Sequence, residues 1–127
     1  MSAKRCFSPD ASPKAVGPYN HGVQIGNLLY TAGQVPLDPA TGKLVDGGIA
    51  EQTERVLDNI EIILQSEGLS FAHVVKTTIF MTDLGEFSYV NEIYAKRFEL
   101  DFPVRSTVQV AALPLGASIE IEVVAHY

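Results

Sequence analysis

With 127 residues, 46% of them hydrophobic and 19% charged, the chain is long enough to bury a core, and its composition excludes a disordered protein. Nine Lys and Arg against fifteen Asp and Glu give a net charge of −6, and the scattered basic residues disfavour nucleic-acid binding. Cys6 is the single cysteine and no apolar run approaches ~20 residues, so we expect one domain over residues 1–127, without disulfide or membrane contact, in the cytoplasm or an organelle matrix.

The N-terminal part predicts short strands and an ordered loop. We expect a first strand at about Arg5–Ser8, followed by a proline-containing loop in which Tyr19 follows a rigid Gly-Pro pair. Tyr19 either projects into a cleft or packs its ring on the sheet. The stretch 22–35 contains two extended runs joined at Gly26-Asn27, which tolerate positive φ and predict a β-hairpin. The turn-rich stretch 36–48 should be a surface loop.

The middle of the chain predicts a helix and then a buried strand. Apolar residues recur at helical spacing over about Ile49–Glu67, and Gly68 stands where a C-terminal cap belongs. The segment His73–Thr82 is rich in β-branched residues and apolar on both faces, which indicates a strand in the interior of a sheet. Asp83 and Glu86 have the spacing of a capping box, and a second helix should follow to about residue 100.

The last quarter, FPVRSTVQVAALPLGASIEIEVV at residues 102–124, reads as two strands separated by a Pro-Gly loop. Strand alternation places Arg105, Thr107 and Gln109 on one face of the first strand, and Glu120 and Glu122 on the polar face of the second. If the two strands form a hairpin centred near residue 114, Glu120 opposes Gln109 and the two polar faces coincide.

This order of elements predicts an α+β fold with one mixed sheet. Both strand-helix-strand connections should be right-handed, so both helices should cover the same face of the sheet. The other face would then be bare, and we expect it to carry Arg105 and Glu120 beside apolar neighbours. A half-apolar bare face in a small chain predicts an oligomer with the polar site at or beside the contact.

Few residues are arranged for chemistry. The histidines share no metal-ligand spacing with each other or with Cys6, so no metal site is expected. GxSxG, Walker and GxGxxG motifs are absent, and Cys6 has no base placed near it in the sequence. Arg105 and Glu120 remain, either as a functional site or as an ordinary cross-strand ion pair or two solvated residues.

As a site, this pair predicts hydrolysis of a small acid. An Arg guanidinium binds a carboxylate through two parallel hydrogen bonds. A nearby Glu accepts a proton from water or passes one to a leaving amine. The implied reaction takes place next to the carboxylate of the substrate.

Five segments of the sequence resemble one known family. They are GPYNHGV (17–23), LYTAGQVP (29–36), VVKTTIFMTDLGEFSYVNEIY (74–94), FPVRSTVQVAALP (102–114) and IEIEVVA (119–125). Together they resemble the Rid family, also called YjgF, and most closely its RidA branch of reactive intermediate deaminases. The likeness spans almost the whole chain.

The resemblance implies a chorismate-mutase-like fold, a homotrimer with ligand sites between subunits, and cofactor-free hydrolysis of 2-imino acids to 2-keto acids and ammonia. The substrates implied are 2-iminobutanoate and 2-iminopropanoate, with protection of pyridoxal-phosphate enzymes from 2-aminoacrylate as the purpose. By the same resemblance, Arg105 binds the substrate carboxylate and Glu120 positions or activates water. The other substrate-binding positions implied are Tyr19, Gly33, Asn91 and Thr107.

Three places depart from the family pattern: Ala32 and Thr107 stand where Ser and Cys are frequent, and Asn20-His21 stands where Ser-Gln is common. The substitution at Ala32 is expected to affect turnover or the preferred imine if that hydroxyl orients substrate. Two alternatives to the deaminase stay open: a non-catalytic trimeric binder or sensor of small 2-keto or amino acids, and a nuclease, which the acidic charge disfavours.

Overall fold

The N-terminal strands pair in sequence order. The computed structural model describes residues 3–127, in which β1 (Arg5–Phe7), β2 (Gly22–Ile25) and β3 (Leu28–Thr31) form an antiparallel series. The expected hairpin turn is confirmed: Gly26 has a φ of +56°, a conformation that glycine adopts without a steric penalty. The second run of the hairpin ends at Thr31, earlier than the pattern predicted.

The first helix and the buried strand are confirmed close to their expected bounds. Helix α1 (Ile49–Ser66) buries the apolar residues that recur at helical spacing, and the chain leaves it at Gly68 with a φ of +72°. A 3-10 turn, η1 (Phe71–His73), leads into β4 (Val74–Met81), which has strands on both sides. Along β4, Thr77, Ile79 and Met81 are buried, as the alternation of a covered sheet requires.

The start of the second helix differs from the prediction. The carboxylate of Asp83 accepts the Gly85 N–H at 2.8 Å and caps a separate 3-10 turn, η2 (Leu84–Glu86). The α-helix itself, α2, begins at Phe87 and ends at Phe98. Capping spacing identified where the chain turns, but not the type of the first helical turn.

The strand order corrects the expected hairpin. The sheet has the order β1-β2-β3-β6-β4-β5, with β5 (Val104–Gln109) at an edge and β6 (Ile119–His126) between β3 and β4. β4 pairs with β5 in parallel and with β6 in antiparallel, so β5 and β6 are not neighbours. The parallel pairing follows from the α2 crossover, and the chain returns through η3 (Pro114–Gly116) to the other side of β4.

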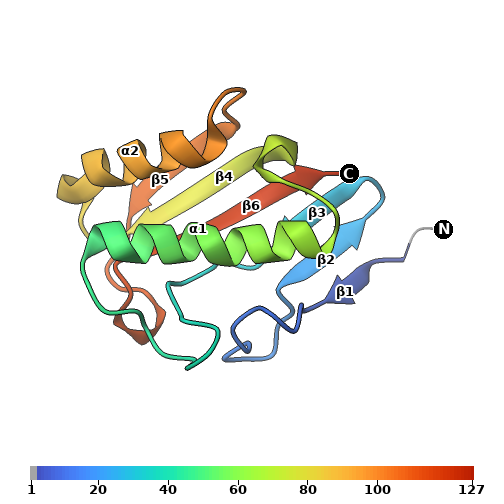
Figure 1. Cartoon of the computed structure of the whole chain (residues 1–127), viewed down its shortest axis with the longest axis horizontal. Helices are drawn as coiled ribbons and strands as arrows, with labels where there is room; N and C mark the ends of the chain where they lie inside the picture. The colour runs from blue at the N-terminus through green and yellow to red at the C-terminus, as the bar shows by residue number, and fades with distance from the viewer. Residues whose placement is uncertain (1–2) are drawn as a thin grey trace.

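Both helices cover one face of the sheet, and the other face is bare (Figure 1). The predicted α+β class, with one mixed sheet and two helices on one face, is confirmed. The core lies between the sheet and the helices and includes Leu57, Ile60, Ile79 and Ile121, all with no exposed surface. Within residues 3–127, the structure contains no helix of the length and apolarity that crossing a membrane requires.

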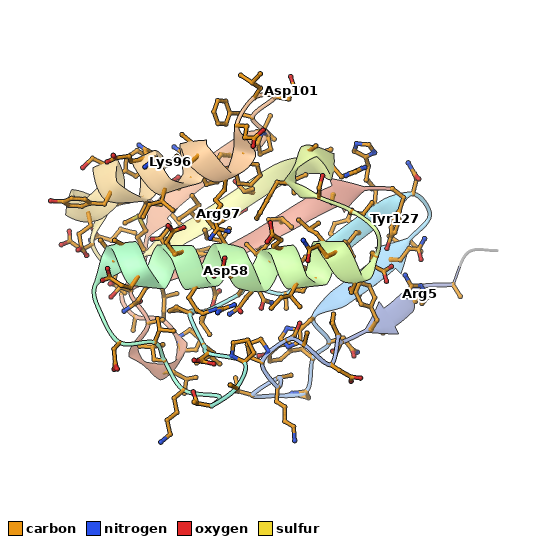
Figure 2. All side chains as sticks on the ribbon, in the orientation of Figure 1. Arg5, Asp58, Lys96, Arg97, Asp101 and Tyr127 are labelled. Atoms are coloured by element: carbon orange, nitrogen blue, oxygen red, sulfur yellow. The ribbon has the colours of Figure 1, made fainter. Side chains whose placement is uncertain are left out.

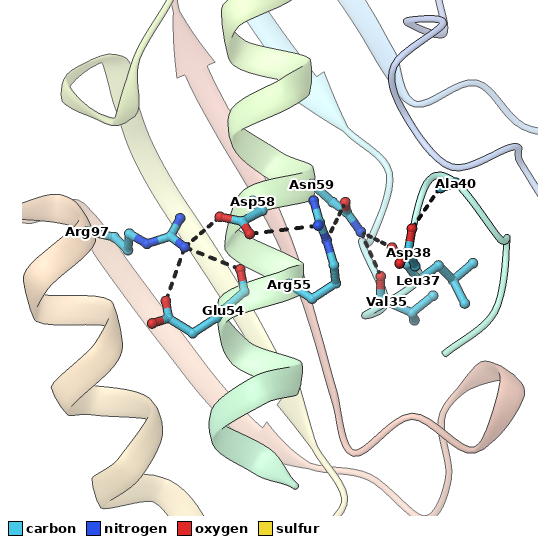
Figure 3. Close-up of polar contacts among 9 residues, drawn as sticks. All are labelled: Val35, Leu37, Asp38, Ala40, Glu54, Arg55, Asp58, Asn59 and Arg97. Atoms are coloured by element: carbon cyan, nitrogen blue, oxygen red, sulfur yellow. Dashed lines mark hydrogen bonds and ion pairs between the residues drawn. The ribbon is translucent and has the colours of Figure 1, made fainter. Parts of the chain in front are cut away.

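A polar contact joins the two helices. Figure 2 shows Arg97 of α2 directed at Asp58 of α1, and Figure 3 shows its contacts at close range. The Arg97 guanidinium donates to Asp58 at 2.6 Å and to the Glu54 carboxylate at 3.1 Å. This contact holds α2, which carries one wall of the candidate site, against α1.

Candidate functional site

Arg105 lies on the helix-covered face of the sheet. It pairs with Thr77 of β4, whose buried hydroxyl is 2.8 Å from the hydroxyl of Tyr94 on α2. The Arg105 guanidinium carbon lies 5.0 Å from the Tyr94 ring centroid and 5.2 Å from that of Phe87. Arg105 therefore reaches α2 along the open edge of the sheet.

The surroundings of Arg105 suit a small anion. No Asp or Glu among residues 3–127 lies within 4 Å of its guanidinium, while two aromatic rings hold it by cation–π contact. Its hydrogen-bond donors are thus available to a carboxylate, which it can bind in bidentate geometry. A pocket of about 360 Å³ opens here, lined by Asn91, Tyr94, Ala95, Phe102, Pro103 and Arg105.

Glu120 lies on the bare face of the sheet. It pairs with Phe80 of β4, whose side chain points away from the helices because it alternates with buried Ile79 and Met81. Partial burial, and to a lesser extent the charge of Glu122, raises the pKa of Glu120. A carboxylate with a raised pKa is suited to general acid–base chemistry near neutral pH.

A glycine makes room for the Glu120 side chain. A Cβ atom at Gly33 would stand 2.5 Å from Glu120 Oε2 and 2.7 Å from its carboxyl carbon, closer than ordinary van der Waals contact. Only a residue without a Cβ leaves the carboxylate in this position. The cleft beside it has a volume of about 240 Å³ and is lined by Val16, Tyr19, Ala32, Gly33, Val35, Pro114 and Glu120.

The segment after Gly33 is held by two elements of the fold. The Gln34 N–H donates to the Ile121 carbonyl at 2.8 Å, and the Ile121 N–H donates back to the Gln34 carbonyl at 3.1 Å. On the helix side, the buried Asn59 amide of α1 donates to the carbonyls of Val35 at 3.3 Å and Leu37 at 2.9 Å (Figure 3). These hydrogen bonds tie this cleft wall to both β6 and α1.

The predicted site residues fall into two separate groups. Asn91 lies with Arg105 in one pocket, while Tyr19 and Gly33 lie with Glu120 in the other. The expectation that Arg105 and Glu120 share a face is wrong, because Arg105 pairs with inward-facing Thr77 and Glu120 with outward-facing Phe80. The predicted register, with Glu120 opposite Gln109, is wrong because β4 lies between the two strands.

Thr107 lines neither pocket. It pairs with buried Ile79, so its side chain lies on the helix-covered face, and its hydroxyl is buried without a hydrogen-bond partner in the described residues. β5 is an edge strand of the sheet, so the N–H and C=O groups on its outer side have no partner within the sheet, and the role of Thr107 stays a prediction.

Sequence reasoning missed several residues of the two pockets. The sequence predicted only a helix over the stretch with Phe87 and Tyr94, whereas Tyr94 lines the Arg105 pocket and the rings of Tyr94 and Phe87 both contact the Arg105 guanidinium. Val16 and Val35 lie in loops, and Pro114 begins the short turn η3; apolar residues in such segments carry no periodic signal. Within residues 3–127, no three His, Cys, Asp or Glu side chains gather as metal ligands.

Sequence comparison matches the chain to one family over most of its length. The family model described as Endoribonuclease L-PSP matches residues 9–127. The chain is 47% identical over 125 residues to Protein DfrA of Myxococcus xanthus, covering 97% of this chain and 95% of that one. It is 45% identical over 122 residues to the Homo sapiens protein named 2-iminobutanoate/2-iminopropanoate deaminase, covering 96% and 89%.

Solved structures agree over the whole fold. The Yersinia pestis protein YyfA, described as a protein of unknown function of the conserved Rid family, superposes with a TM-score of 0.95 at 45% identity, covering 98% of this chain and 100% of that chain. Escherichia coli TdcF, solved with bound serine, gives a TM-score of 0.90 at 36% identity, with 97% and 98% coverage.

Proposed function

Because the chain belongs to the Endoribonuclease L-PSP family, also called YjgF or Rid, we propose that it hydrolyses 2-imino acids to 2-keto acids and ammonia. We propose 2-iminobutanoate and 2-iminopropanoate as substrates, since the human relative at 45% identity is named 2-iminobutanoate/2-iminopropanoate deaminase. The observation that carries it is Glu120, a carboxylate of raised pKa held against Gly33 in a mostly apolar cleft.

The reaction needs an acid–base group and an anion anchor. Water adds to the imine carbon, a proton moves to nitrogen, and the tetrahedral intermediate expels ammonia as the keto C=O bond forms. Glu120 takes the proton from the attacking water and returns one to the leaving amine, while Arg105 binds the substrate carboxylate. The overall step is hydrolysis without a change in oxidation state, so we propose that it proceeds without a cofactor.

We propose that two copies of the chain form each site. Arg105 and Glu120 lie on opposite faces of one sheet, so a substrate that contacts both must lie between two molecules. The bare face supports this arrangement, because Tyr30, Val104 and Val108 expose apolar surface on the same face of the sheet as Glu120 and Glu122. The family resemblance implies a homotrimer, in which each of the three sites takes Glu120 from one copy and Arg105 from the next.

In this role the protein would remove the enamine 2-aminoacrylate, through its imine tautomer 2-iminopropanoate, in the cytoplasm before it inactivates pyridoxal-phosphate enzymes.

Mixing two inactive variants tests both the chemistry and the shared site. Arg105→Ala and Glu120→Gln should each lose hydrolysis of an imine generated in situ. Refolded together at equal concentration, they should recover about a quarter of wild-type activity, because each site then draws its two residues from independent copies. Each variant refolded alone is the control and should stay inactive.

Two results would contradict the proposal in different ways. If wild-type protein releases keto acid no faster than buffer, the chain is not a deaminase. If the wild type is active but the mixture recovers nothing, although native mass spectrometry shows mixed oligomers, then Arg105 and Glu120 do not act across a subunit contact.

A non-catalytic binder of small amino or keto acids is the second candidate. The observation that favours it is the serine bound to Escherichia coli TdcF, a relative of the same fold. In a binder, Glu120→Gln would leave the affinity for pyruvate and serine close to wild type, and no hydrolysis would be lost. Calorimetric titration of both ligands, beside the imine assay, separates the two functions.

A further inference from the structure

We infer that the buried pair His21 and Gln34 positions the two walls of the Glu120 cleft relative to each other. One wall is the loop that carries Tyr19, and the other is the Gly33 surface on which Glu120 rests. The inference rests on the proposed function for its kinetic consequence, whereas its structural consequence is measurable without turnover.

The hydrogen bonds of the pair define the state of both side chains. His21 and Gln34 are only 5% and 3% exposed. The His21 Nε2 atom lies 2.6 Å from the Pro13 carbonyl, which can only accept, so Nε2 carries the proton. His21 Nδ1 is therefore the acceptor for the Gln34 amide N–H at 3.2 Å, and the same amide nitrogen donates to the Ala32 carbonyl at 3.2 Å.

His21 ties the pair to the Tyr19 wall. Its ring meets the Tyr19 ring edge to face with centroids 6.0 Å apart, and its carbonyl accepts the Ala32 N–H at 2.9 Å. The Val16 N–H donates to the Tyr19 hydroxyl at 3.2 Å, which closes the loop on itself. The Tyr19 ring thus contacts the His21 ring, and the Tyr19 hydroxyl accepts the backbone N–H of Val16.

Gln34 ties the pair to Glu120. Its backbone exchanges two hydrogen bonds with Ile121, the residue that follows Glu120 in β6. Gly33, which precedes Gln34 in the chain, lies directly against the Glu120 carboxylate. A displacement of Gln34 would therefore change both the strand position and the contact surface of Glu120.

The directional bonds explain why this buried contact is polar. Apolar contacts of the same size would stabilise the loop without specifying an angle or a distance, whereas each hydrogen bond here has a defined donor and acceptor. Neither His21 nor Gln34 lines the cleft, so both act through Tyr19 and Glu120. They are positioning residues and not catalytic ones.

Three substitutions separate positioning from stability. Gln34→Met keeps length and burial but removes both donated bonds, and His21→Phe keeps a ring but removes donor and acceptor. His21→Gln restores one donor and one acceptor. Thr53→Val is the control, since the buried Thr53 hydroxyl bonds only within α1, to the Ile49 carbonyl at 2.6 Å.

The expected kinetic signature is a loss of kcat with little change in KM. Misplacement by about 1 Å costs on the order of 10²-fold in rate, so Gln34→Met and His21→Phe should lose that much of kcat. KM should hold, because the carboxylate anchor Arg105 lies in the other pocket. His21→Gln should recover most of the lost rate, and Thr53→Val should keep the wild-type rate.

A readout independent of turnover is the titration of Glu120, followed by carbon NMR of the labelled side-chain carboxylates. In Gln34→Met and His21→Phe the pKa of Glu120 should fall towards its ordinary value as the cleft opens. If both variants keep the kcat and the Glu120 titration of Thr53→Val, the inference is overturned. An inactive wild type would refute the proposed function, while the titration would still decide the inference.

Discussion

Replacing Gly33 by Ala tests whether the position of Glu120 controls activity. The added Cβ would stand 2.5 Å from Glu120 Oε2, whereas ordinary contact begins at 3.4 Å, so the carboxylate must retreat by about 0.9 Å. The end of a Glu side chain rotates at little cost, and the φ of Gly33 is outside the left-handed region. Stability should therefore stay within about 1 kcal/mol, helped by the lower chain entropy of the unfolded alanine variant.

The rate should respond far more strongly than stability. A displacement of nearly 1 Å at a group that transfers protons costs on the order of 10²-fold in kcat. The assay generates 2-aminoacrylate with a dehydratase and follows keto acid release above the rate in buffer, while urea unfolding measures stability. Gly48→Ala is the matched control, because its Cβ meets nothing closer than 3.9 Å. A Gly33→Ala protein with wild-type kcat would refute the reasoning.

Three further predictions concern the charge of Glu120, the charge of its neighbour Glu122, and the anchoring of the cleft wall by Asn59. The pKa of Glu120 is higher in the folded than in the unfolded state, so ionisation of Glu120 lowers the free energy of unfolding as the pH rises above the ordinary pKa of 4.5. In urea unfolding near pH 7, Glu120→Gln should therefore be more stable than the wild type. The difference should vanish below pH 4.5. The charge of Glu122 raises the pKa of Glu120, so Glu122→Gln should lower that pKa and move the acid limb of the pH–rate profile to lower pH. An unchanged acid limb would mean that the ionisation of Glu120 does not set it. Asn59→Ala leaves the Leu37 carbonyl without its donor, while the Val35 carbonyl keeps the Leu37 N–H at 2.8 Å, and should cost about 1–3 kcal/mol in urea unfolding. A cost under about 0.5 kcal/mol would show that the loop is held elsewhere.

Local patterns in the sequence predicted the elements because each depends on neighbouring residues. The apolar spacing of 49–66, the Gly68 cap and the Gly26 turn are properties of short segments, and all three occur in the structure. The resemblance of five segments predicted the family, and the match over residues 9–127 confirms it. The assignment of roles to Arg105 and Glu120 stays a prediction.

Strand pairing was outside the reach of these patterns. The two strands of the last quarter looked like a hairpin because a Pro-Gly loop joins them, yet β4 lies between them. Which strands pair depends on which arrangement buries β4 and the two helices together. That arrangement is made of contacts between residues far apart in the sequence, which local patterns do not contain.

The prediction of which residues share a face within each strand was therefore right, while the prediction that β5 and β6 pair and present their polar residues on the same face of the sheet was wrong. Sequence alone determined that Arg105, Thr107 and Gln109 share one face, and that Glu120 and Glu122 share another, because side chains alternate along any strand. Only the tertiary structure decided that these two faces are opposite, because a shift of one residue in register moves every side chain to the other side.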